Sequence, residues 1–264
     1  MSSAPFHLTV CKIGGSVLTG IGAYQAATRA LRIPDPASRE RLVVVVSAEY
    51  GHTDALFGEA TQVSAVPDSA ALDLLWSTGE IRSVALLTLA LQSAGISAVG
   101  LNVHETGLRV GAGDDRLELN PLALRAALAH HSVVVVPGFL AVRHQRVVTL
   151  GRGGSDWTAV SLAAALGARR CELFKDVDGY FTADPNTAAD ARAIPALSFA
   201  DALKLADDGC PLVQRQAIVA ARDAGMTLVV RSFAGRGTTL TAQGSGLTAQ
   251  SAGPSVPTLS HKST

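Results

Sequence analysis

Two uninterrupted runs of β-branched residues constrain the fold of this chain more than any other feature. Residues 42–47 read L-V-V-V-V-S, and residues 132–136 read S-V-V-V-V. Neither run alternates apolar with polar side chains, so both faces of each strand are expected to be buried. Strands of this kind are typical of a parallel sheet that is covered by helices on both faces.

Helical patterns alternate with these and further apolar strands along the chain. Residues 103–119 are polar and irregular, with a hairpin as the alternative, residues 140–150 alternate like a hairpin, and Asn120-Pro121 is a typical helix start. The alternation predicts a mainly parallel sheet with helices on both faces. Strands are expected at 8–13, 42–47, 96–101, 132–136, 170–174, 227–232 and 238–240, and helices at 23–31, 69–76, 80–93, 121–130, 155–166, 198–206 and 212–224.

Length and composition favour one α/β domain. The chain has 264 residues, without an internal repeat or an interior linker, so residues 1–240 are expected to form a single catalytic domain. From residue 241 onward the composition changes to Ser, Gly, Thr, Ala, Gln and Pro. Residues 241–264 are therefore expected to be a disordered tail.

Charge and cysteine content argue against several classes of function. The chain carries 22 basic and 22 acidic residues, which argues against a nucleic-acid partner. Its three cysteines form neither a disulfide framework nor a CxxC metal motif.

The N-terminus lacks a signal-peptide pattern, and no apolar run approaches the roughly 20 residues that span a bilayer. We expect a cytoplasmic protein that acts away from membranes. Since 48% of residues are hydrophobic and 17% charged, we also expect a homodimer or higher homo-oligomer.

The first candidate site is K-I-G-G-S, from Lys12 to Ser16, at the end of the first strand. Glycines there let backbone N–H groups approach a phosphate, and Lys12 supplies a positive charge for a phosphoryl group. The motif is not a Walker A loop, because G-x-x-x-x-G-K-[ST] is absent. An ordinary strand-to-helix turn is the alternative.

The second candidate site is G-R-G-G-S-D, from Gly151 to Asp156. Ser155 is expected to cap a helix that begins at Asp156. The free N–H groups and partial positive charge of a helix N-terminus suit an anion. A cap after a glycine turn is the alternative, but a cap requires neither Arg152 nor two glycines.

The third candidate site is the acidic segment K-D-V-D-G, from Lys175 to Gly179, followed by T-A-D-P at residues 182–185. Carboxylates on a loop that follows a strand can hold Mg²⁺ or accept hydrogen bonds from a ribose. A polar turn built on Asp-Gly is the alternative. All three candidates follow apolar strands, at the sheet edge where open α/β folds bind ligands.

In combination these motifs resemble the amino-acid kinase family, and within it the aspartate kinases. The resemblance covers almost the whole globular part, and the R-G-G-S-D and D-V-D-G…T-A-D-P blocks are its most specific elements. The matching segments are K-I-G-G-S at 12–16, V-V-S-A-E-Y-G-H-T at 45–53, S-T-G-E at 77–80, V-V-V-P-G-F at 134–139, L-G-R-G-G-S-D-W-T-A at 150–159, K-D-V-D-G-Y-F-T-A-D-P at 175–185, V-R-S-F at 230–233 and G-T-T-L at 237–240.

The resemblance implies a three-layer α/β/α fold and transfer of the ATP γ-phosphoryl group to a carboxylate. For aspartate kinases the product is β-aspartyl phosphate, and Mg²⁺ arrives with the nucleotide. A carboxylate nucleophile is already ionised at pH 7, so no general base is required. The resemblance assigns catalysis to Lys12 and Asp156, phosphate binding to Gly14, Gly15 and Ser16, amino-acid binding to Ser47, Thr53, Glu80, Arg152 and Ser155, and the nucleotide pocket to Lys175, Asp176 and Phe181.

Individual roles follow from the same resemblance. Lys12 neutralises charge on the migrating phosphoryl group, and Asp156 helps to order Lys12. Glu80 accepts the substrate ammonium. Arg152 clamps the α-carboxylate, which it matches in planar geometry.

The chain departs from the aspartate-kinase pattern at two nucleotide-side cations. Pro211 stands where the family has a lysine, and Asn186 stands where it has an arginine. Because each charge-assisted contact contributes roughly 1.5–3 kcal/mol, ATP binding is expected to weaken unless Lys175 and Arg215 compensate. A catalytically weak homologue that binds a ligand or partner is one alternative, and a kinase for another acceptor is a second.

The segment after Leu240 is too short for the regulatory ACT domains that aspartate kinases of primary metabolism usually carry. We therefore expect an enzyme without feedback inhibition by lysine or threonine, of the kind that would serve a specialised pathway.

Overall fold

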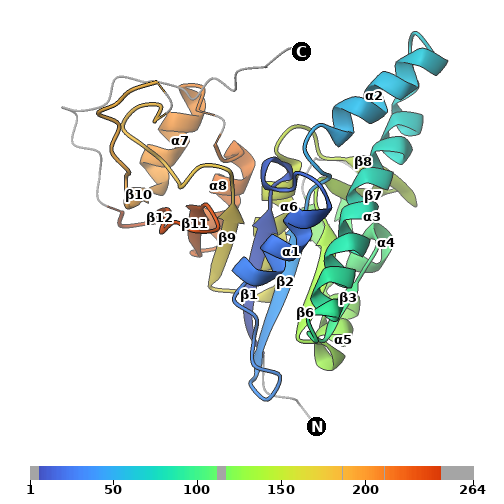
Figure 1. Cartoon of the computed structure of the whole chain (residues 1–264), viewed down its shortest axis with the longest axis horizontal. Coiled ribbons are helices and arrows are strands. Elements are labelled where there is room, and N and C mark those ends of the chain that lie inside the picture. Colours follow the sequence, from blue (N-terminus) through green and yellow to red (C-terminus); the bar gives the residue numbers. More distant parts are fainter. Residues whose placement is uncertain (1–5, 112–116, 186, 211, 245–264) are drawn as a thin grey trace.

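The computed structural model describes residues 6–111, 117–185, 187–210 and 212–244. Its main sheet has eight strands in the order β10-β12-β11-β9-β1-β2-β6-β3 (Figure 1). Every neighbouring pair is parallel except β11 and β12. The strands are β1 (His7–Ile13), β2 (Glu40–Val46), β3 (Ala98–Gly100), β6 (Val133–Pro137), β9 (Arg170–Phe174), β10 (Ala196–Ser198), β11 (Thr227–Arg231) and β12 (Thr238–Thr241).

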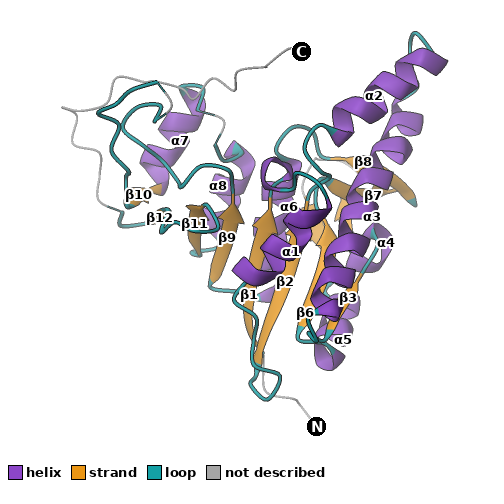
Figure 2. Ribbon diagram, in the orientation of Figure 1, coloured by secondary structure: helices purple, strands orange, loops and turns teal. Residues whose placement is uncertain are grey.

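Helices cover both faces of this sheet, which confirms the three-layer α/β/α fold (Figure 2). One face packs against α1 (Ile21–Ala30) and α3 (Ser69–Ser93). The other packs against α5 (Leu122–His130), α6 (Gly154–Leu166), α7 (Phe199–Asp207) and α8 (Arg215–Asp223).

The valines of β2 explain why this strand does not alternate apolar with polar residues. Val43 and Val45 belong to the core under α6, whereas Val44 and Val46 belong to the core under α1 and α3. All four side chains have no exposed surface. Successive side chains of a strand point to opposite faces, so a strand between two helical layers needs an apolar residue at every position.

A second sheet of four strands lies beside the main one, in the order β5-β4-β7-β8. Its strands are β4 (Leu108–Val110), β5 (Leu117–Leu119), β7 (Leu140–Arg143) and β8 (Arg146–Thr149). The expected hairpin at residues 140–150 is confirmed by the antiparallel pairing of β7 with β8. In the segment before it, for which a hairpin was the alternative to irregular structure, β4 and β5 pair antiparallel. That segment also contains the short helix α4 (Val103–Thr106), which has a capping box from Asn102 and Glu105.

Helix α3 differs from the expectation of two separate helices, because it continues through Ser77-Thr78-Gly79. Gly79 has a packing role there. A Cβ atom at this position would lie 2.8 Å from the ring of His52. Helix α2 (His52–Val63), which begins at His52, was not expected from the sequence, and in Figure 1 it projects with the start of α3 away from the sheet.

Helix α3 is also long and apolar enough, by length and composition, to cross a membrane. Core helices pass the same test. Leu87 and Leu91 of α3 have no exposed surface and pack with residues of α1 and β6. We therefore interpret α3 as a core helix.

The carboxyl end of β1 lies near the centre of one edge of the main sheet. Strand β1 lies between β2 and β9, with α1 on one face and α6 on the other. The carboxyl ends of β1, β2, β6, β9 and β11 share this edge because the strands are parallel. Open α/β sheets bind ligands at such a point.

Candidate active site

The loop after β1 is packed too closely to accept side chains. A Cβ at Gly15 would lie 2.6 Å from the carbonyl oxygen of Ala48, and one at Gly14 would lie 3.1 Å from the Lys12 Nζ. The N–H of Gly14 donates to the carbonyl oxygen of Phe174 at 3.1 Å. Glycine at both positions therefore brings the backbone close to Lys12 and to the neighbouring loops.

Helix α6 begins earlier in the chain than expected, and Ser155 is not its cap. Gly153 is the N-cap, with a left-handed φ of 77°, and Gly154 is the first helical residue. The prediction was wrong because two consecutive glycines let the chain enter the helix without a capping side chain. Ser155 instead lies buried in the first turn, where its Oγ accepts a hydrogen bond from Ser47 Oγ at 3.0 Å.

Asp156 joins Lys12 of β1 to Lys175 of the loop that follows β9. Its Oδ1 lies 3.0 Å from Lys12 Nζ and its Oδ2 lies 2.8 Å from Lys175 Nζ. The Oδ1 contact is an ion pair rather than an aligned hydrogen bond, since that oxygen has no hydrogen-bond partner by geometry among the described residues. The predicted meeting of Lys12 and Asp156 is thus confirmed. Lys175, predicted to line the nucleotide pocket, is bound to the same carboxylate.

The balance of burial and neighbouring charges lowers the pKa values of both Asp156 and Lys12. Burial alone would raise the pKa of Asp156, but Lys12 and Lys175 outweigh it and lower that pKa to about 2. Burial lowers the pKa of Lys12 to about 8, although Asp156 opposes this shift. Lys12 is therefore a desolvated ammonium that is ready to interact with an incoming anion.

Glu80 is a buried carboxylate with one oxygen left unsatisfied. Its side chain is 3% exposed, and Oε2 has no hydrogen-bond partner among the described residues. Burial raises its pKa to about 8, while the N–H of Ala48 and the charge of Lys12 act in the opposite direction. A buried acceptor without a partner is costly in free energy, so it favours a cationic ligand such as an ammonium group.

We predict that Glu80 makes the protein less stable as pH rises. Between pH 4.5 and about 8 the folded state holds a proton on Glu80 that the unfolded state has released. The free energy of unfolding therefore falls across this window. Urea denaturation at pH 5 and pH 8 should show a smaller fall for Glu80→Gln than for the wild type. Glu59→Gln, at an exposed position of α2, is the control, and an unchanged fall in Glu80→Gln would contradict the prediction.

The acidic loop contributes one exposed carboxylate to the site. Asp176 Oδ1 accepts a hydrogen bond from Ser16 Oγ at 3.0 Å, which joins this loop to the glycine loop. Asp178 is structural, because its Oδ1 accepts from the N–H of Ser232 at 3.0 Å. The described residues hold no cluster of three or more metal-ligating side chains, so Mg²⁺ would need ligands from a bound nucleotide.

Three further predicted residues, Arg152, Thr53 and Phe181, make no hydrogen bond or ion pair with the cluster of Lys12, Asp156 and Lys175 among the described residues. Arg152 is exposed and makes no ion pair with any described residue, which leaves it free for a carboxylate. Thr53 lies in the first turn of α2, and its carbonyl oxygen accepts from Trp76 Nε1 at 3.2 Å. Phe181 is half-buried in an isolated bridge with Ala193.

The sequence profile described as the amino acid kinase family matches residues 7–232. This chain belongs to the amino acid kinase family. The match extends from the start of β1 to just past the end of β11 and so includes Lys12, Glu80 and Asp156.

Within this family the chain is similar to aspartate kinases. It is 42% identical over 196 residues to an aspartokinase of Thermus thermophilus, covering 73% of this chain and 48% of that protein. It is 37% identical over 230 residues to aspartokinase 2 of Bacillus subtilis, covering 85% and 56%. The crystal structure of aspartate kinase from Synechocystis superposes with a TM-score of 0.77 at 36% identity, covering 89% of this chain and 40% of that one. The chain spans about half the length of the curated relatives it matches.

The two departures from the family pattern, Pro211 and Asn186, lie outside the described residues. Arg215, one of the two cations expected to compensate for them, forms a surface ion pair with Asp207 at 2.7 Å. Because both partners are more than half exposed, this pair is weak enough to exchange for a stronger anion.

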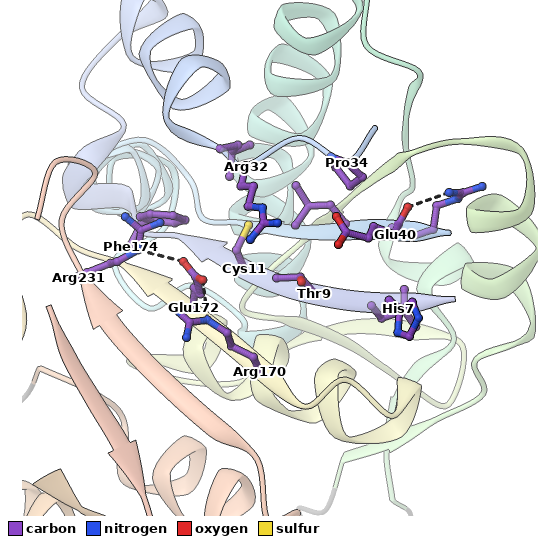
Figure 3. A pocket seen from close by; sticks show the side chains of 14 residues that line it. His7, Thr9, Cys11, Arg32, Pro34, Glu40, Arg170, Glu172, Phe174 and Arg231 are labelled. Carbon is purple, nitrogen blue, oxygen red and sulfur yellow. Dashed lines mark hydrogen bonds and ion pairs between the residues drawn. The ribbon is translucent and has the colours of Figure 1, made fainter. Parts of the chain in front are cut away.

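A separate groove of about 390 Å³ lies on the α1 face of the sheet, away from the cluster of Lys12, Asp156 and Lys175 (Figure 3). Glu172 lies there between Arg170 at 2.7 Å and Arg231 at 2.9 Å, so both of these guanidinium groups already have a carboxylate partner. The groove is lined by neither Lys12 nor Asp156. The buried cluster of Lys12, Asp156 and Lys175, rather than this groove, is therefore the candidate active site.

Two contributions to the site were not anticipated from the sequence. Gly138, after β6, leaves room for Ser155, since a Cβ there would lie 2.7 Å from the Ser155 Oγ. The N–H of Gln214 approaches Asp156 Oδ2 at 3.5 Å. The Pro-Gly pair at the carboxyl end of a buried strand was a usable signal for Gly138, whereas Gln214 had none.

Proposed function

We propose that this chain transfers the γ-phosphoryl group of ATP to the side-chain carboxylate of L-aspartate, forming 4-phospho-L-aspartate. The observation that carries the proposal is the convergence of Lys12, Asp156 and Lys175 beside the glycine loop. Phosphoryl transfer depends on positioning and positive charge more than on covalent catalysis. This cluster supplies both.

Lys12 is the residue that we assign to the migrating phosphoryl group. Asp156 holds its ammonium by an ion pair of 3.0 Å in a site that is almost closed to water. Electrostatic contacts strengthen when water is excluded, so Lys12 stabilises developing negative charge more than an exposed lysine would. ATP is a substrate here, and Mg²⁺ carried by the nucleotide would supply further positive charge.

The amino-acid side is assigned to Glu80 and Arg152. The unsatisfied Oε2 of Glu80 suits the substrate ammonium, and the exposed guanidinium of Arg152 suits the α-carboxylate. Together they favour an α-amino acid over a phosphate, carbamate or nucleotide acceptor. Relatives named aspartokinase support aspartate among the acidic amino acids.

Trapping with hydroxylamine tests the proposal. An acyl phosphate reacts with hydroxylamine to give a hydroxamate, so the wild type with Mg-ATP should give a hydroxamate with L-aspartate and less with L-glutamate. No hydroxamate with any amino acid would favour a non-catalytic homologue, and ADP release with another acceptor would favour a different substrate. Lack of feedback control remains a prediction, which inhibition curves with lysine and threonine test.

We predict that Lys175→Ala raises the KM for ATP far more than the KM for the amino acid. Lys175 lies on the acidic loop that is assigned to the nucleotide, where its charge is expected to compensate in part for Pro211 and Asn186. Lys204→Ala, at an exposed position in the last turn of α7, is the matched control and should change neither constant. An unchanged KM for ATP in Lys175→Ala would restrict Lys175 to its pairing with Asp156.

A further inference from the structure

We propose that the ion pair between Glu49 and Arg82 positions the loop at residues 47–50, and through it the amino-acid site. Glu49 and Arg82 are positioning residues in this proposal, since neither is assigned a contact with substrate. The inference rests on the proposed function, because it assigns the amino-acid site to Glu80.

The loop at residues 47–50 lies between the glycine loop and helix α3. The N–H of Ser47 donates to the carbonyl oxygen of Ile13 at 3.1 Å, and that of Tyr50 donates to Leu18 at 3.1 Å. Between these anchors, the carbonyl group of Ala48 packs against Gly15. The N–H of Ala48 donates to the carboxylate of Glu80. One peptide segment therefore contacts both halves of the proposed site.

Glu49 of this loop forms an ion pair with Arg82, which lies on α3 two residues after Glu80. Its Oε1 lies 2.7 Å from Arg82 Nη1, and its side chain is 16% exposed. That oxygen has no aligned hydrogen bond within the described chain, so the contact is an ion pair. Burial alone would raise the pKa of Glu49, but Arg82 and the hydroxyl of Tyr24 outweigh it and lower that pKa. Glu49 is therefore held as a carboxylate.

Tyr24 extends this connection to helix α1. The Tyr24 side chain is 2% exposed, and its hydroxyl forms a 3.0 Å hydrogen bond with Ser83 Oγ. Glu49 thus contacts groups from two helices that pack on the same face of the sheet. These contacts restrict the loop through a side chain that the proposed chemistry does not otherwise use.

The ion pair should affect the site more than the overall stability. The Arg82 side chain is 41% exposed, and pairs of this kind contribute little to the free energy of unfolding. The hydrogen bond from Ala48 to Glu80 depends on where the loop lies, and a small displacement there changes how Glu80 meets an ammonium group. Loss of the pair is therefore expected to weaken amino-acid binding without unfolding the protein.

A double-mutant cycle with Glu49→Gln and Arg82→Gln tests this proposal. Each variant should raise the amino-acid KM about tenfold, within the usual range for coupled contacts, while the KM for ATP changes less than about twofold. The amino-acid KM of the double variant should be no higher than that of either single variant, because all three lose the same ion pair. Arg222→Gln breaks a more exposed pair on α8, in which the arginine side chain is 48% exposed against 41% for Arg82, and is the control. An unchanged amino-acid KM in both single variants, or strictly additive effects, would overturn the proposal.

Hydrogen exchange separates failure of this inference from failure of the proposed function. Without substrate, the amides of Ala48 and Glu49 should exchange faster in both single variants than in the wild type and in Arg222→Gln. Unchanged exchange overturns the positioning role even if the enzyme phosphorylates aspartate. Faster exchange in a protein that forms no acyl phosphate supports the positioning role while it rejects the proposed reaction.

Discussion

Asp156→Asn is expected to destabilise the protein by about 3–5 kcal/mol at pH 7, because it leaves two buried lysines facing each other without a counter-charge. Lys12 and Lys175 both lie within 3.0 Å of this carboxylate, whose side chain is 2% exposed. Since its pKa is lowered to about 2, Asp156 contributes stability above its unfolded pKa of about 3.9. That contribution is lost as pH falls toward 2, and the asparagine variant should lack this part of the acid sensitivity.

Urea denaturation measures this effect against a matched variant. Asp207→Asn also removes a carboxylate from an ion pair, but its partner Arg215 is 57% exposed. The loss there should stay below about 1 kcal/mol. Adding Lys175→Met to Asp156→Asn should restore part of the stability, because one uncompensated charge is removed. Equal losses in Asp156→Asn and Asp207→Asn would contradict the structural role of Asp156.

Lys12→Ala is expected to lower kcat by at least about 10²–10³-fold, the effect of removing one preorganised donor from a charged transition state. Stability should change much less than in Asp156→Asn. Burial disfavours the charge of Lys12, as its lowered pKa shows, and Asp156 keeps Lys175 as a partner. A large loss of activity with little loss of stability is the combination expected of a residue retained for function.

The pH dependence of the wild type provides an independent check on Lys12. Its pKa of about 8 means that the ammonium loses its proton as pH rises through that value. Because the neutral amine no longer stabilises a phosphoryl group, kcat/KM should fall above about pH 8. A kcat/KM that stays constant from pH 7 to pH 10 would remove the ammonium of Lys12 from the reaction.

The layered fold could be predicted because its strands are buried on both faces. The valine runs of β2 and β6 require helices on two sides, and the structure provides them. Helix α2 was missed because it buries only Leu56 and carries little periodic apolar signal. Helix α3 was divided at Gly79, where a glycine indicated a break but allows the close approach of His52. Tertiary packing decided that position rather than local propensity.

The site could be predicted where motif residues follow strands. Lys12 and Asp156 are separated by more than half the chain, yet parallel strands bring their loops to one edge. The buried environment of Glu80 was not visible in the sequence, because burial depends on how α3 packs against the loop at residues 47–50. For the same reason Glu49 and Arg82, which are ordinary charged residues in the sequence, showed no sign of their pairing.

Single-turnover transfer tests the central claim most directly. Wild type and Lys12→Ala, each in excess over Mg-ATP labelled at the γ-phosphate, are mixed with saturating L-aspartate and quenched at successive times, and labelled acyl phosphate is measured. The account predicts transfer by the wild type and a rate at least about 10²-fold lower for Lys12→Ala, with both ligands still bound. Equal transfer rates in the two proteins would contradict it.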